Sequence, residues 1–528
     1  MGSLVFRRAL LTAIAFSLLA PASGSAGPAA DARAIRAGLT SAVADGRLDP
    51  ADAYRYRIDV RRCREVLKLL RYSRFSNLAA VLHVVARHAP RFNRRRVLAL
   101  FGMLELNTEY LAVHPMPASG TDIRDDEGVV YRATWSHGLQ FHPLGNFAAL
   151  NADLTAGNDE RAEALARALV ARAVGPSGTS RWEYYFSFGG GRPPWTSGMA
   201  QAAAAQALAR ASVRYGDLAL LGAAGRAYRA VADGLVMQLS TGPWVRLYSF
   251  NRLVVLNAQL QTVLSVANYA ALADDSRAAA FAVRLRRAAT DLFPRFDTRY
   301  WSRYSLGRES PLRYHLYVID LLRKLALRTG EASWTHRADR FDRYTTEPPL
   351  LAPGSPVRTL YPIPADGHRD VAPIRFWLSK MSSVTLSVAG DEQSYRLTGG
   401  WHTLIWRPGR QSPGTYTPTV RAVDLAENRG SAALQPVMIR LDREPPVVRA
   451  SVARRTLTWR SVDEGTPWLR LRVRLWRPGV FKLVRLGIHP LSGSLRLPLP
   501  RGRWTAKLVA FDSSGNRTAV PLGVVPAP

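Results

Sequence analysis

Residues 311–328 read PLRYHLYVIDLLRKLALR. Apolar side chains recur in this stretch every three or four residues, at Leu312, Leu316, Ile319, Leu322 and Ala326. Such spacing places apolar residues on one face of an α-helix, so the stretch predicts an amphipathic helix. Tyr314 and His315 stand at its start, and Tyr304 precedes Tyr314 by ten residues. Two tyrosines and a histidine thus lie close together at a predicted helix N-terminus.

The chain before this helix also predicts helices, separated by clusters of glycine, proline and aspartate that are typical of turns. They are expected over residues 62–70, 77–87, 95–111, 146–173, 196–215, 218–239, 254–272, 277–293 and 311–328. Successive helices with short connections favour helical hairpins packed around a common core. We therefore expect a helical domain over residues 56–347, preceded by a mobile segment over residues 27–55.

A Pro-rich linker at residues 348–357 ends the helical pattern, and short alternating runs typical of β-strands follow. They cover residues 374–378, 383–388, 394–397, 402–406 and 417–423. An internal repeat is also present: Gly414, Tyr416, Ala422, Asp424 and Asn428 recur 88 residues later as Gly502, Trp504, Ala510, Asp512 and Asn516. This period predicts two β-sandwiches of the immunoglobulin or fibronectin type III kind, over residues 358–443 and 444–528.

The repeated Asp and Asn residues predict a loop that closes the last hairpin of each sandwich through side-chain-to-backbone hydrogen bonds. Calcium binding is the alternative, but each loop supplies few acidic ligands. The acidic residues Asp122, Asp125, Asp126 and Glu127 are interpreted as a solvated loop for the same reason. We therefore expect no metal site.

The N-terminus has the zones of a secretory signal peptide. Arg7 and Arg8 precede an apolar run from Ala9 to Ala20, and small residues follow to Ala26. This run is too short to span a bilayer. We expect residues 1–26 to be a signal peptide and the protein to be secreted, with an uncleaved anchor as the alternative.

Basic residues far outnumber acidic ones, which gives a formal charge of +32. Five of the 72 basic residues are lysine and 67 are arginine. Arginine binds carboxylates and sulfates through two parallel hydrogen bonds, so the charge suits a polyanionic partner. The predicted export signal excludes nucleic acid as the expected polyanion and favours an acidic polysaccharide.

Three stretches in this order resemble the D-glucuronyl C5-epimerase family, the heparosan-glucuronate 5-epimerases included. Trp195, Ser197, Met199, Ala200 and Gln201 resemble its Trp-x-Ser-x-Met-Ala-Gln signature, and Leu256-Asn257 resembles its Leu-Asn-Gly helix. The Tyr304 to His315 stretch resembles its C-terminal region. The resemblance covers roughly residues 130–345 and implies that the helices form an (α/α) toroid.

The resemblance implies Tyr304, Tyr314 and Tyr248 as catalytic tyrosines. Epimerisation removes a proton beside a carboxylate and returns one to the opposite ring face, so the site needs an acid, a base and cationic groups. Arginines near Tyr304 and Tyr314 are expected to lower the pKa of these tyrosines. Alternatively, both are ordinary residues of an exposed loop and a helix start. No cofactor is needed for this reaction.

One position departs from the family pattern. The glutamate that serves as the opposing acid or base in the family corresponds to Leu247 or, with a shift of one residue, to Arg246. Glu183 is the nearby carboxylate that could replace it, although pairing with Arg181 or Arg192 is the alternative role. Arg246 then becomes a candidate substrate contact.

Further substrate contacts are expected around these motifs, because aromatic rings stack on sugars and arginine pairs with acid groups. The candidates are His315, Arg313, Arg308, Trp195, Gln201 and His142. The predicted function is an isomerase that inverts C5 of glucuronate within an acidic polysaccharide, with the sandwiches contacting polymer, cell wall or other surfaces. A glycan-binding protein without turnover and a polysaccharide lyase that begins with the same proton abstraction remain as alternatives.

Overall fold

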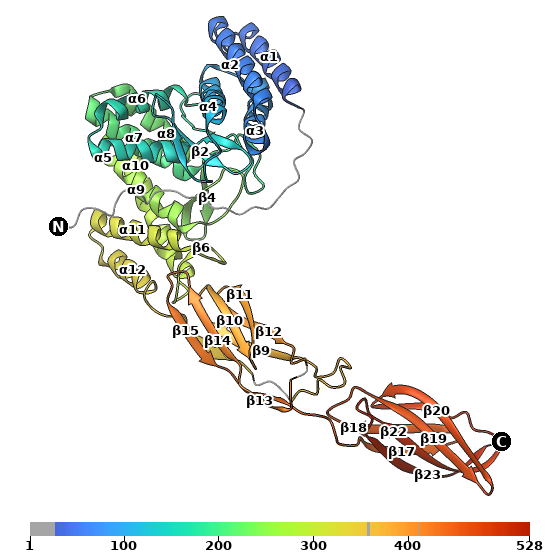
Figure 1. Ribbon diagram of the computed structural model, residues 1–528. Helices are drawn as coiled ribbons and strands as arrows, with labels where there is room; N and C mark the ends of the chain where they lie inside the picture. Colours follow the sequence, from blue (N-terminus) through green and yellow to red (C-terminus); the bar gives the residue numbers. More distant parts are fainter. Residues whose placement is uncertain (1–26, 356–358, 410, 528) are drawn as a thin grey trace. The chain divides into compact units, whose positions relative to one another are not determined.

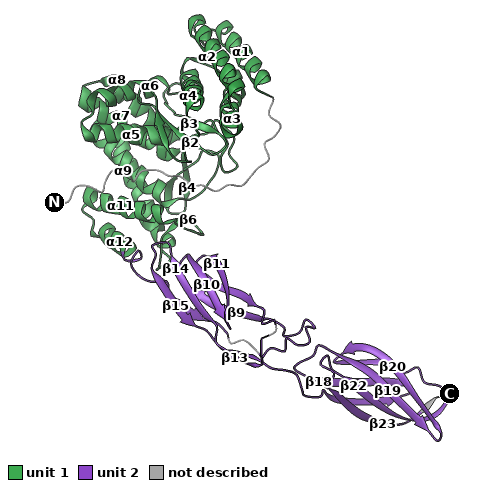
Figure 2. Ribbon diagram, in the orientation of Figure 1, with its two compact units in different colours: residues 1–342 green, residues 343–528 purple. Residues whose placement is uncertain are grey.

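The computed structural model describes residues 27–355, 359–409 and 411–527 (Figure 1). The chain forms two compact units, the first ending at Asp342 and the second beginning at Arg343 (Figure 2). The predicted signal peptide, residues 1–26, lies outside the described residues. Among the helices that are described, none is long and apolar enough to cross a membrane.

The first unit is helical, as predicted. Its α-helices are α1 (Pro28–Ala44), α2 (Pro50–Leu69), α3 (Tyr72–His88), α4 (Arg94–Val113), α5 (Pro143–Ala156), α6 (Asp159–Ala171), α7 (Gly198–Tyr215), α8 (Leu218–Gly234), α9 (Leu256–Ala273), α10 (Ser276–Leu292), α11 (Leu312–Thr329) and α12 (Ala332–Arg343). Two 3₁₀ turns also form, η1 (Ala89–Arg91) and η2 (Phe293–Phe296). Helix α7 contacts α5, α8 and α9, and its alanine-rich sequence lets these helices approach closely.

Short strands connect the helices of the first unit. They are β1 (Asp122–Arg124), β2 (Val130–Thr134), β3 (Gly138–Phe141), β4 (Val236–Leu239), β5 (Gly242–Val245), β6 (Arg303–Ser305) and β7 (Arg308–Glu309). They pair as the antiparallel sheet β1-β2-β3 and as the hairpins β4-β5 and β6-β7. These strands matter because the predicted residues Tyr304 and Arg308 lie on them, and His142 and Tyr248 follow them closely.

Helix α1 and the start of α2 lie within residues 27–55, where the sequence analysis expected a mobile segment. Helix α1 buries Ile35, Leu39 and Ala42, which are spaced three or four residues apart. Asp49 caps α2 by accepting a hydrogen bond from the Ala51 N–H (2.8 Å). The alanine and aspartate content that suggested mobility instead supplies helix formers and a cap.

Two predicted helices are shorter than expected. The helix expected over residues 146–173 is divided into α5 and α6 at Gly157, whose φ of 71° is left-handed and ends α5. The helix expected over residues 218–239 ends at Gly234, and its last residues form strand β4 instead. Gly157 terminates α5 because other residues resist the left-handed conformation that it adopts.

The second unit contains β-strands in several sheets, as predicted. We call residues 343–441 the first β module and residues 442–527 the second. The first contains β8 (Leu351–Pro353), β9 (Ala372–Leu378), β10 (Ser382–Val388), β11 (Asp391–Leu397), β12 (Gly400–Trp406), β13 (Gly414–Tyr416), β14 (Thr419–Asp424), β15 (Arg429–Ala433) and β16 (Val437–Ile439). The second contains β17 (Val447–Ala453), β18 (Thr456–Val462), β19 (Trp468–Arg477), β20 (Val480–Pro490), β21 (Ser492–Arg496), β22 (Gly502–Phe511) and β23 (Arg517–Ala527).

Each module encloses its own apolar core between a four-stranded and a three-stranded sheet. The first has the strand orders β11-β10-β14-β15 and β12-β9-β8, and the second has β20-β19-β22-β23 and β17-β18-β21. The cores contain Trp406 in the first module and Trp504 in the second, each about 1% exposed. Alternating burial along β9 and β18 places every second residue in the core, as expected for sheets with one solvated face.

The hairpin loops of the two modules confirm the interpretation of the repeat. Asp424 accepts a hydrogen bond from the Asn428 N–H (2.9 Å), and Asp512 accepts one from the Asn516 N–H (2.8 Å). The Asp and Asn residues therefore shape equivalent loops between β14 and β15 and between β22 and β23.

Candidate functional site

Tyr248, Tyr304 and Tyr314 come together from three separate elements. Tyr248 lies in the loop after β5, Tyr304 on β6, and Tyr314 in the first turn of α11. A β-bridge between Val255 and Ser305 ties β6 to the start of α9. We call these three residues the tyrosine cluster.

The tyrosine rings pack on one another and on apolar side chains. The ring centroids of Tyr304 and Tyr314 are 4.9 Å apart, with an interplanar angle of 71°. This edge-to-face arrangement is favoured by the charge distribution of aromatic rings. The surrounding apolar residues are Met199, Val245, Leu247, Val255 and Ala258. Leu247, at the position of the family glutamate, is therefore part of this apolar packing.

Burial raises the pKa of all three hydroxyl groups. For Tyr248 the charges of Tyr304 and Tyr314 act in the same direction as burial. For Tyr304 a hydrogen-bonding interaction with Tyr248 and the charge of Arg308 oppose burial, but burial outweighs them. For Tyr314 burial also dominates, and the charge of Arg132 opposes it. Arg308 acts on Tyr304 in the expected direction, but the predicted lowering of the tyrosine pKa values is wrong, because the low dielectric penalises a phenolate and the net shift is upward.

Several buried polar atoms around the tyrosine cluster have no hydrogen-bond partner. They are Tyr304 Oη, Arg132 Nη1 and Asn257 Oδ1. The Tyr304 hydroxyl lies near that of Tyr248, but no well-aligned hydrogen bond satisfies it. Asn257 is the second residue of α9, next to Ala258, which packs on the tyrosines. Buried polar atoms without partners are costly, so they indicate a place where a ligand supplies the missing bonds.

Arg132 is a site residue that the sequence analysis missed. It lies on β2, is 4% exposed, and is close enough to lower the pKa of Tyr314. Its Nε and Nη2 donate to the two carboxylate oxygens of Asp122 (2.6 Å each), which leaves Nη1 without a partner. A lone arginine within the otherwise apolar stretch Val129–Ala133 is the sequence signal that could have identified it.

Aromatic side chains extend from the tyrosine cluster. The Trp195 ring stacks on Tyr184 with centroids 4.1 Å apart, and it meets Tyr248 edge to face at 5.5 Å. Phe188 and Phe250 complete this group. The His142 ring meets the Tyr184 ring edge to face at 5.3 Å. The structure therefore places the predicted residue Trp195 against the tyrosine cluster and His142 against Tyr184, on which Trp195 stacks.

Trp195 and His142 also have structural partners. Trp195 Nε1 donates to the Phe186 carbonyl (2.8 Å). His142 caps α5, since its Nδ1 accepts a hydrogen bond from the Gly145 N–H (2.9 Å). Burial, together with the charge of Arg132, lowers the pKa of His142, so its imidazole is neutral at pH 7.

His315 lies in the core, away from the role predicted for it. Its Nδ1 is 3.3 Å from the Ser302 N–H, and its Nε2 is 2.7 Å from the Phe341 carbonyl. These partners require Nδ1 to accept and Nε2 to donate. The ring stacks on Trp301 with centroids 3.8 Å apart and is fully buried. Both ring nitrogens are engaged inside the protein, which contradicts a direct substrate contact.

Glu183 pairs with Arg96 of α4, not with Arg181 or Arg192. Arg96 Nε and Nη2 donate to the two carboxylate oxygens at 2.8 and 3.0 Å, and both side chains are largely buried. This two-bond geometry is the most specific one available to a carboxylate. Glu183 thus joins α4 to the segment that leads into Trp195, and its carboxylate is already occupied.

The remaining residues predicted to contact substrate lie in different environments. Gln201 is fully buried and holds the backbone of Trp182 through two hydrogen bonds, so it is structural. Arg246 donates to the carbonyls of Ser249 and Asn251 within its own loop. Arg308 and Arg313 are exposed, and Arg308 lies near Tyr304.

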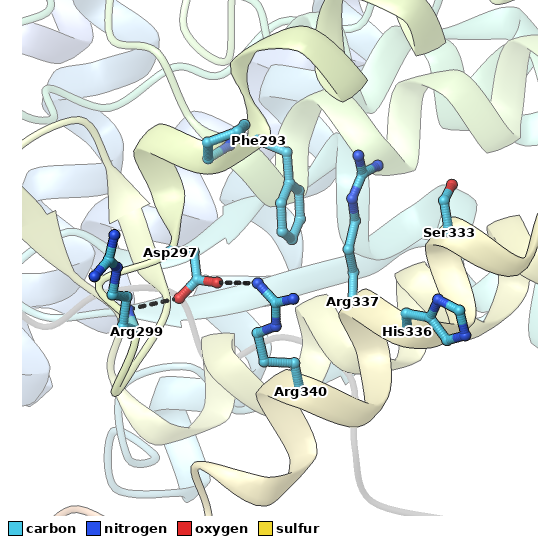
Figure 3. A pocket seen from close by; sticks show the side chains of 8 residues that line it. Phe293, Asp297, Arg299, Ser333, His336, Arg337 and Arg340 are labelled. Carbon is cyan, nitrogen blue, oxygen red and sulfur yellow. Dashed lines mark hydrogen bonds and ion pairs between the residues drawn. The ribbon is translucent and has the colours of Figure 1, made fainter.

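A separate basic pocket of about 470 Å³ lies between η2 and α12 (Figure 3). It is lined by Phe293, Pro294, Asp297, Arg299, Ser333, His336, Arg337 and Arg340. Asp297 pairs with Arg340 at 3.3 Å, and the Arg337 guanidinium lies over the Trp334 ring at 4.5 Å. No member of the tyrosine cluster lines this pocket, but its three arginines suit an anionic group.

Comparison with known families gives one match, to part of the chain. Residues 177–343 match the family model described as the D-glucuronyl C5-epimerase C-terminus. This match supports assignment of residues 177–343 to the C5-epimerase family, and we call this range the C5-epimerase domain. The resemblance inferred from the sequence is confirmed over this range, and the C5-epimerase domain contains the whole tyrosine cluster. Residues beyond 177–343 are not covered by this match.

Solved structures offer weaker similarities. The endo-beta-1,4-glucanase CMCax from Acetobacter xylinum is 13% identical, with 38% of this chain and 71% of that chain covered and a TM-score of 0.30. D-mannose isomerase is 10% identical, with coverages of 51% and 75% and a TM-score of 0.32. The fibronectin(III)-like modules of Clostridium thermocellum CbhA are 12% identical, with coverages of 34% and 95% and a TM-score of 0.16. TM-scores this low do not establish a shared fold. No curated protein matches the chain.

Proposed function

We propose that the protein is an epimerase that inverts C5 of glucuronate residues within an acidic polysaccharide. The observation that carries this proposal is the tyrosine cluster inside the C5-epimerase domain, where Tyr304 Oη is buried without a hydrogen-bond partner and the charge of Arg132, whose Nη1 also has none, acts on Tyr314. Such groups suit a substrate that brings its own carboxylate and hydroxyls into the site.

The raised pKa values indicate the protonation state of the tyrosines before the reaction begins. All three are neutral phenols at pH 7, which suits a tyrosine that returns a proton to C5. The tyrosine that removes the C5 proton must first lose its own. Arg308 beside Tyr304 and Arg132 beside Tyr314 are the cations that favour this ionised form.

Arg132 has a second role in this proposal. When the C5–H bond breaks, the electron pair spreads onto the carboxylate, which becomes more negative. Arg132 Nη1 is buried and has no partner, so it is a donor that needs no rearrangement to bind this group. A buried donor of this kind is worth more than an exposed one because water does not screen it.

The wider architecture fits a polymer substrate. We propose that the helices close into an (α/α) toroid with Trp195 and its aromatic neighbours as sugar-stacking positions. The basic pocket between η2 and α12 supplies a further contact for acid groups of the polysaccharide. The β modules are proposed as immunoglobulin- or fibronectin-like sandwiches that dock polymer, cell wall or another surface. We also propose that the N-terminal segment, residues 1–26, is a signal peptide that directs secretion of the protein.

The experiment that tests the function is proton NMR in D₂O. The full chain is incubated with glucuronate-containing polymers, unsulfated heparosan-like chains included. We expect the C5 proton signal to disappear and iduronate signals to appear. Tyr304→Phe and Tyr314→Phe should each abolish this exchange, because each removes a hydroxyl that carries the proton.

Tyr317→Phe is the matched control. Tyr317 lies on the same helix as Tyr314, one turn further on, and its hydroxyl donates to Gln261 Oε1 (2.8 Å). This variant should keep the exchange, with a modest loss of stability. Retained exchange in both Tyr304→Phe and Tyr314→Phe would overturn the proposed roles of these tyrosines.

Acidic-glycan binding without turnover is the second candidate function. It is supported by Leu247 at the position of the family glutamate and by the pairing of Glu183 with Arg96. Polymer retention with unchanged NMR spectra would favour it. A polysaccharide lyase, the third class, would instead release an unsaturated product that absorbs in the near ultraviolet.

A further inference from the structure

Each β module contains a buried aspartate at an equivalent position, but the charged groups around this aspartate differ between the two modules. Asp424 ends β14 and Asp512 follows β22, and both shape the same hairpin loop of the repeat. The first is 4% exposed and the second 2%. A buried carboxylate is costly unless a positive charge or hydrogen bonds compensate it, so each module needs a solution at this position.

The first β module supplies a lysine. Lys380 lies in the short connection between β9 and β10, and its Nζ is 2.7 Å from Asp424 Oδ2. The ammonium also donates to the Tyr344 carbonyl (2.8 Å) and the Glu347 carbonyl (2.5 Å) on the segment that leads into β8. A buried cation thus sits between the hairpin loop, the β9–β10 connection and the lead-in segment.

In the second β module, acidic residues lie on the segments that correspond to those around Lys380 in the first. Asp463 lies in the connection between β18 and β19, which corresponds to the β9–β10 connection in strand order. Asp442 lies on the lead-in segment, and its carbonyl accepts from Asn516 Nδ2 (3.1 Å), just as the Thr345 carbonyl accepts from Asn428 Nδ2 (2.8 Å). The same three segments meet in both modules, but the second brings three carboxylates together.

The three carboxylates converge on one point. Oxygens of Asp442, Asp463 and Asp512 all lie within 4.8 Å of one another. One oxygen of each, Oδ2, is buried and has no hydrogen-bond partner. Asp512 is nearly fully buried, so water does not solvate its unpartnered oxygen. Burial, followed by the charges of Asp442 and Asp512, raises the pKa of Asp463 to about 6, which reflects the electrostatic cost of this arrangement.

Gly465 provides the space that the cluster needs. A Cβ atom on this residue would lie 2.6 Å from Asp442 Cγ and Oδ2, closer than side-chain atoms tolerate. Its N–H donates to Asp463 Oδ1 (2.8 Å), which orients that carboxylate and leaves Oδ2 toward the cluster. The backbone here therefore holds Asp463 in place and leaves room for Asp442.

We propose that Asp442, Asp463 and Asp512 bind a calcium ion, which takes in the second β module the place that the Lys380 ammonium takes in the first. The ligand chemistry is that of a hard divalent cation, because all three donors are carboxylate oxygens. Calcium accepts oxygens at about 2.3–2.6 Å, so opposite ligands are about 4.6–5.2 Å apart, and a spread of up to 4.8 Å fits this range. Magnesium requires shorter bonds and a regular octahedron, which favours calcium here.

The test is thermal unfolding of the full chain after removal of bound metal by chelation, with and without added calcium chloride. A ligand that binds only the folded state raises the unfolding temperature. For a module of this size we expect calcium to raise the transition of the second β module by about 5 °C or more. Titration calorimetry with calcium chloride should give one site per chain.

Asp463→Asn is the decisive variant, because the amide keeps the oxygen that accepts from the Gly465 N–H and removes only the charge. It should fold, as judged by circular dichroism, and lose both the calcium-induced shift and the calorimetric signal. Glu464→Gln is the matched control. Glu464 is the acidic residue next to Asp463, and its side chain is 69% exposed and pairs with Arg369. Removing the charge of Glu464 should leave the calcium response unchanged.

Two results would overturn the proposal. Calcium that neither binds nor stabilises the wild-type chain would exclude the site, and an unchanged response in folded Asp463→Asn would place the ion elsewhere. The same unfolding experiment is repeated with magnesium chloride. An equal rise in unfolding temperature at the same concentration would overturn the assignment to calcium. Gly465→Ala gives an independent check, since its Cβ should weaken calcium binding by displacing Asp442.

Discussion

Tyr314 and His315 are neighbours in the first turn of α11, yet they belong to opposite kinds of environment. Tyr314 faces the tyrosine cluster, where Tyr304 Oη and Arg132 Nη1 are buried without partners. His315 faces a region that we call the histidine core, made by Trp301, Ser302 and Phe341, where both of its ring nitrogens are bonded. Buried polar groups with partners stabilise a fold, whereas those without partners indicate binding or catalysis.

The largest expected effect separates activity from stability at Tyr304. Tyr304→Phe removes a hydroxyl that has no well-formed hydrogen bond, so the free energy of unfolding should change by less than about 0.5 kcal/mol. Loss of a proton-transferring group should lower turnover by a factor of about 10² to 10⁴. Urea unfolding and NMR-detected exchange measure the two quantities. A variant that is strongly destabilised would instead assign Tyr304 to the core.

The opposite result is expected in the histidine core. His315→Ala removes a buried ring that stacks on Trp301 and bonds to the Phe341 carbonyl, so it should lower the free energy of unfolding by about 3 kcal/mol. Turnover per folded molecule should stay near that of the wild type. Activity and folded fraction are to be measured on the same sample. A stable His315→Ala protein without activity would restore the substrate contact that the sequence predicted.

Arg132 tests whether an unpartnered donor next to the tyrosine cluster binds the substrate. Arg132→Met keeps much of the side-chain volume and removes the charge, and it should weaken polymer binding or lower turnover by about 10- to 100-fold. Asp122→Asn is the matched control, because it removes the carboxylate that holds Arg132 but leaves the guanidinium. Equal losses in both variants would mean that the ion pair matters only for structure.

The smallest expected effect concerns the pH dependence that His142 contributes. Its pKa is lowered by burial in the folded state, so the unfolded chain binds the proton more strongly. The stabilisation is therefore complete above about pH 6.5 and is lost as the pH falls below that value. His142→Asn keeps a side-chain acceptor for capping α5 and removes the titration. Denaturant unfolding at pH 7 and pH 5 should then differ less than in the wild type.

Much of the fold could be predicted from local patterns. Apolar spacing located α3, α4, α7, α9, α10 and α11, and strand alternation located β9, β10, β11, β12 and β14, because these signals depend on neighbouring residues alone. Residues 28–55 could not be distinguished from a mobile segment, since α1 and the start of α2 are stabilised by packing that composition does not reveal. The break at Gly157 illustrates how a single glycine changes one predicted helix into two.

The candidate site was predicted less completely than the fold. Tyr248, Tyr304 and Tyr314 follow from motif resemblance, and the structure brings them together. Arg132 was missed because it lies more than a hundred residues before these tyrosines and carries no motif of its own. His315 and Gln201 belong to the motifs but serve the core, and motif membership does not distinguish these two roles.

The sequence by itself determined the order of helices and strands, the C5-epimerase resemblance and the 88-residue repeat, because each is encoded in residues close together or in matching positions. Only the tertiary structure decided which polar groups find partners. Asp424 meets Lys380 in one module, while the equivalent Asp512 meets Asp442 and Asp463 in the other. Hydrogen-bond and charge partners come from segments distant in sequence, and burial makes their presence or absence energetically decisive.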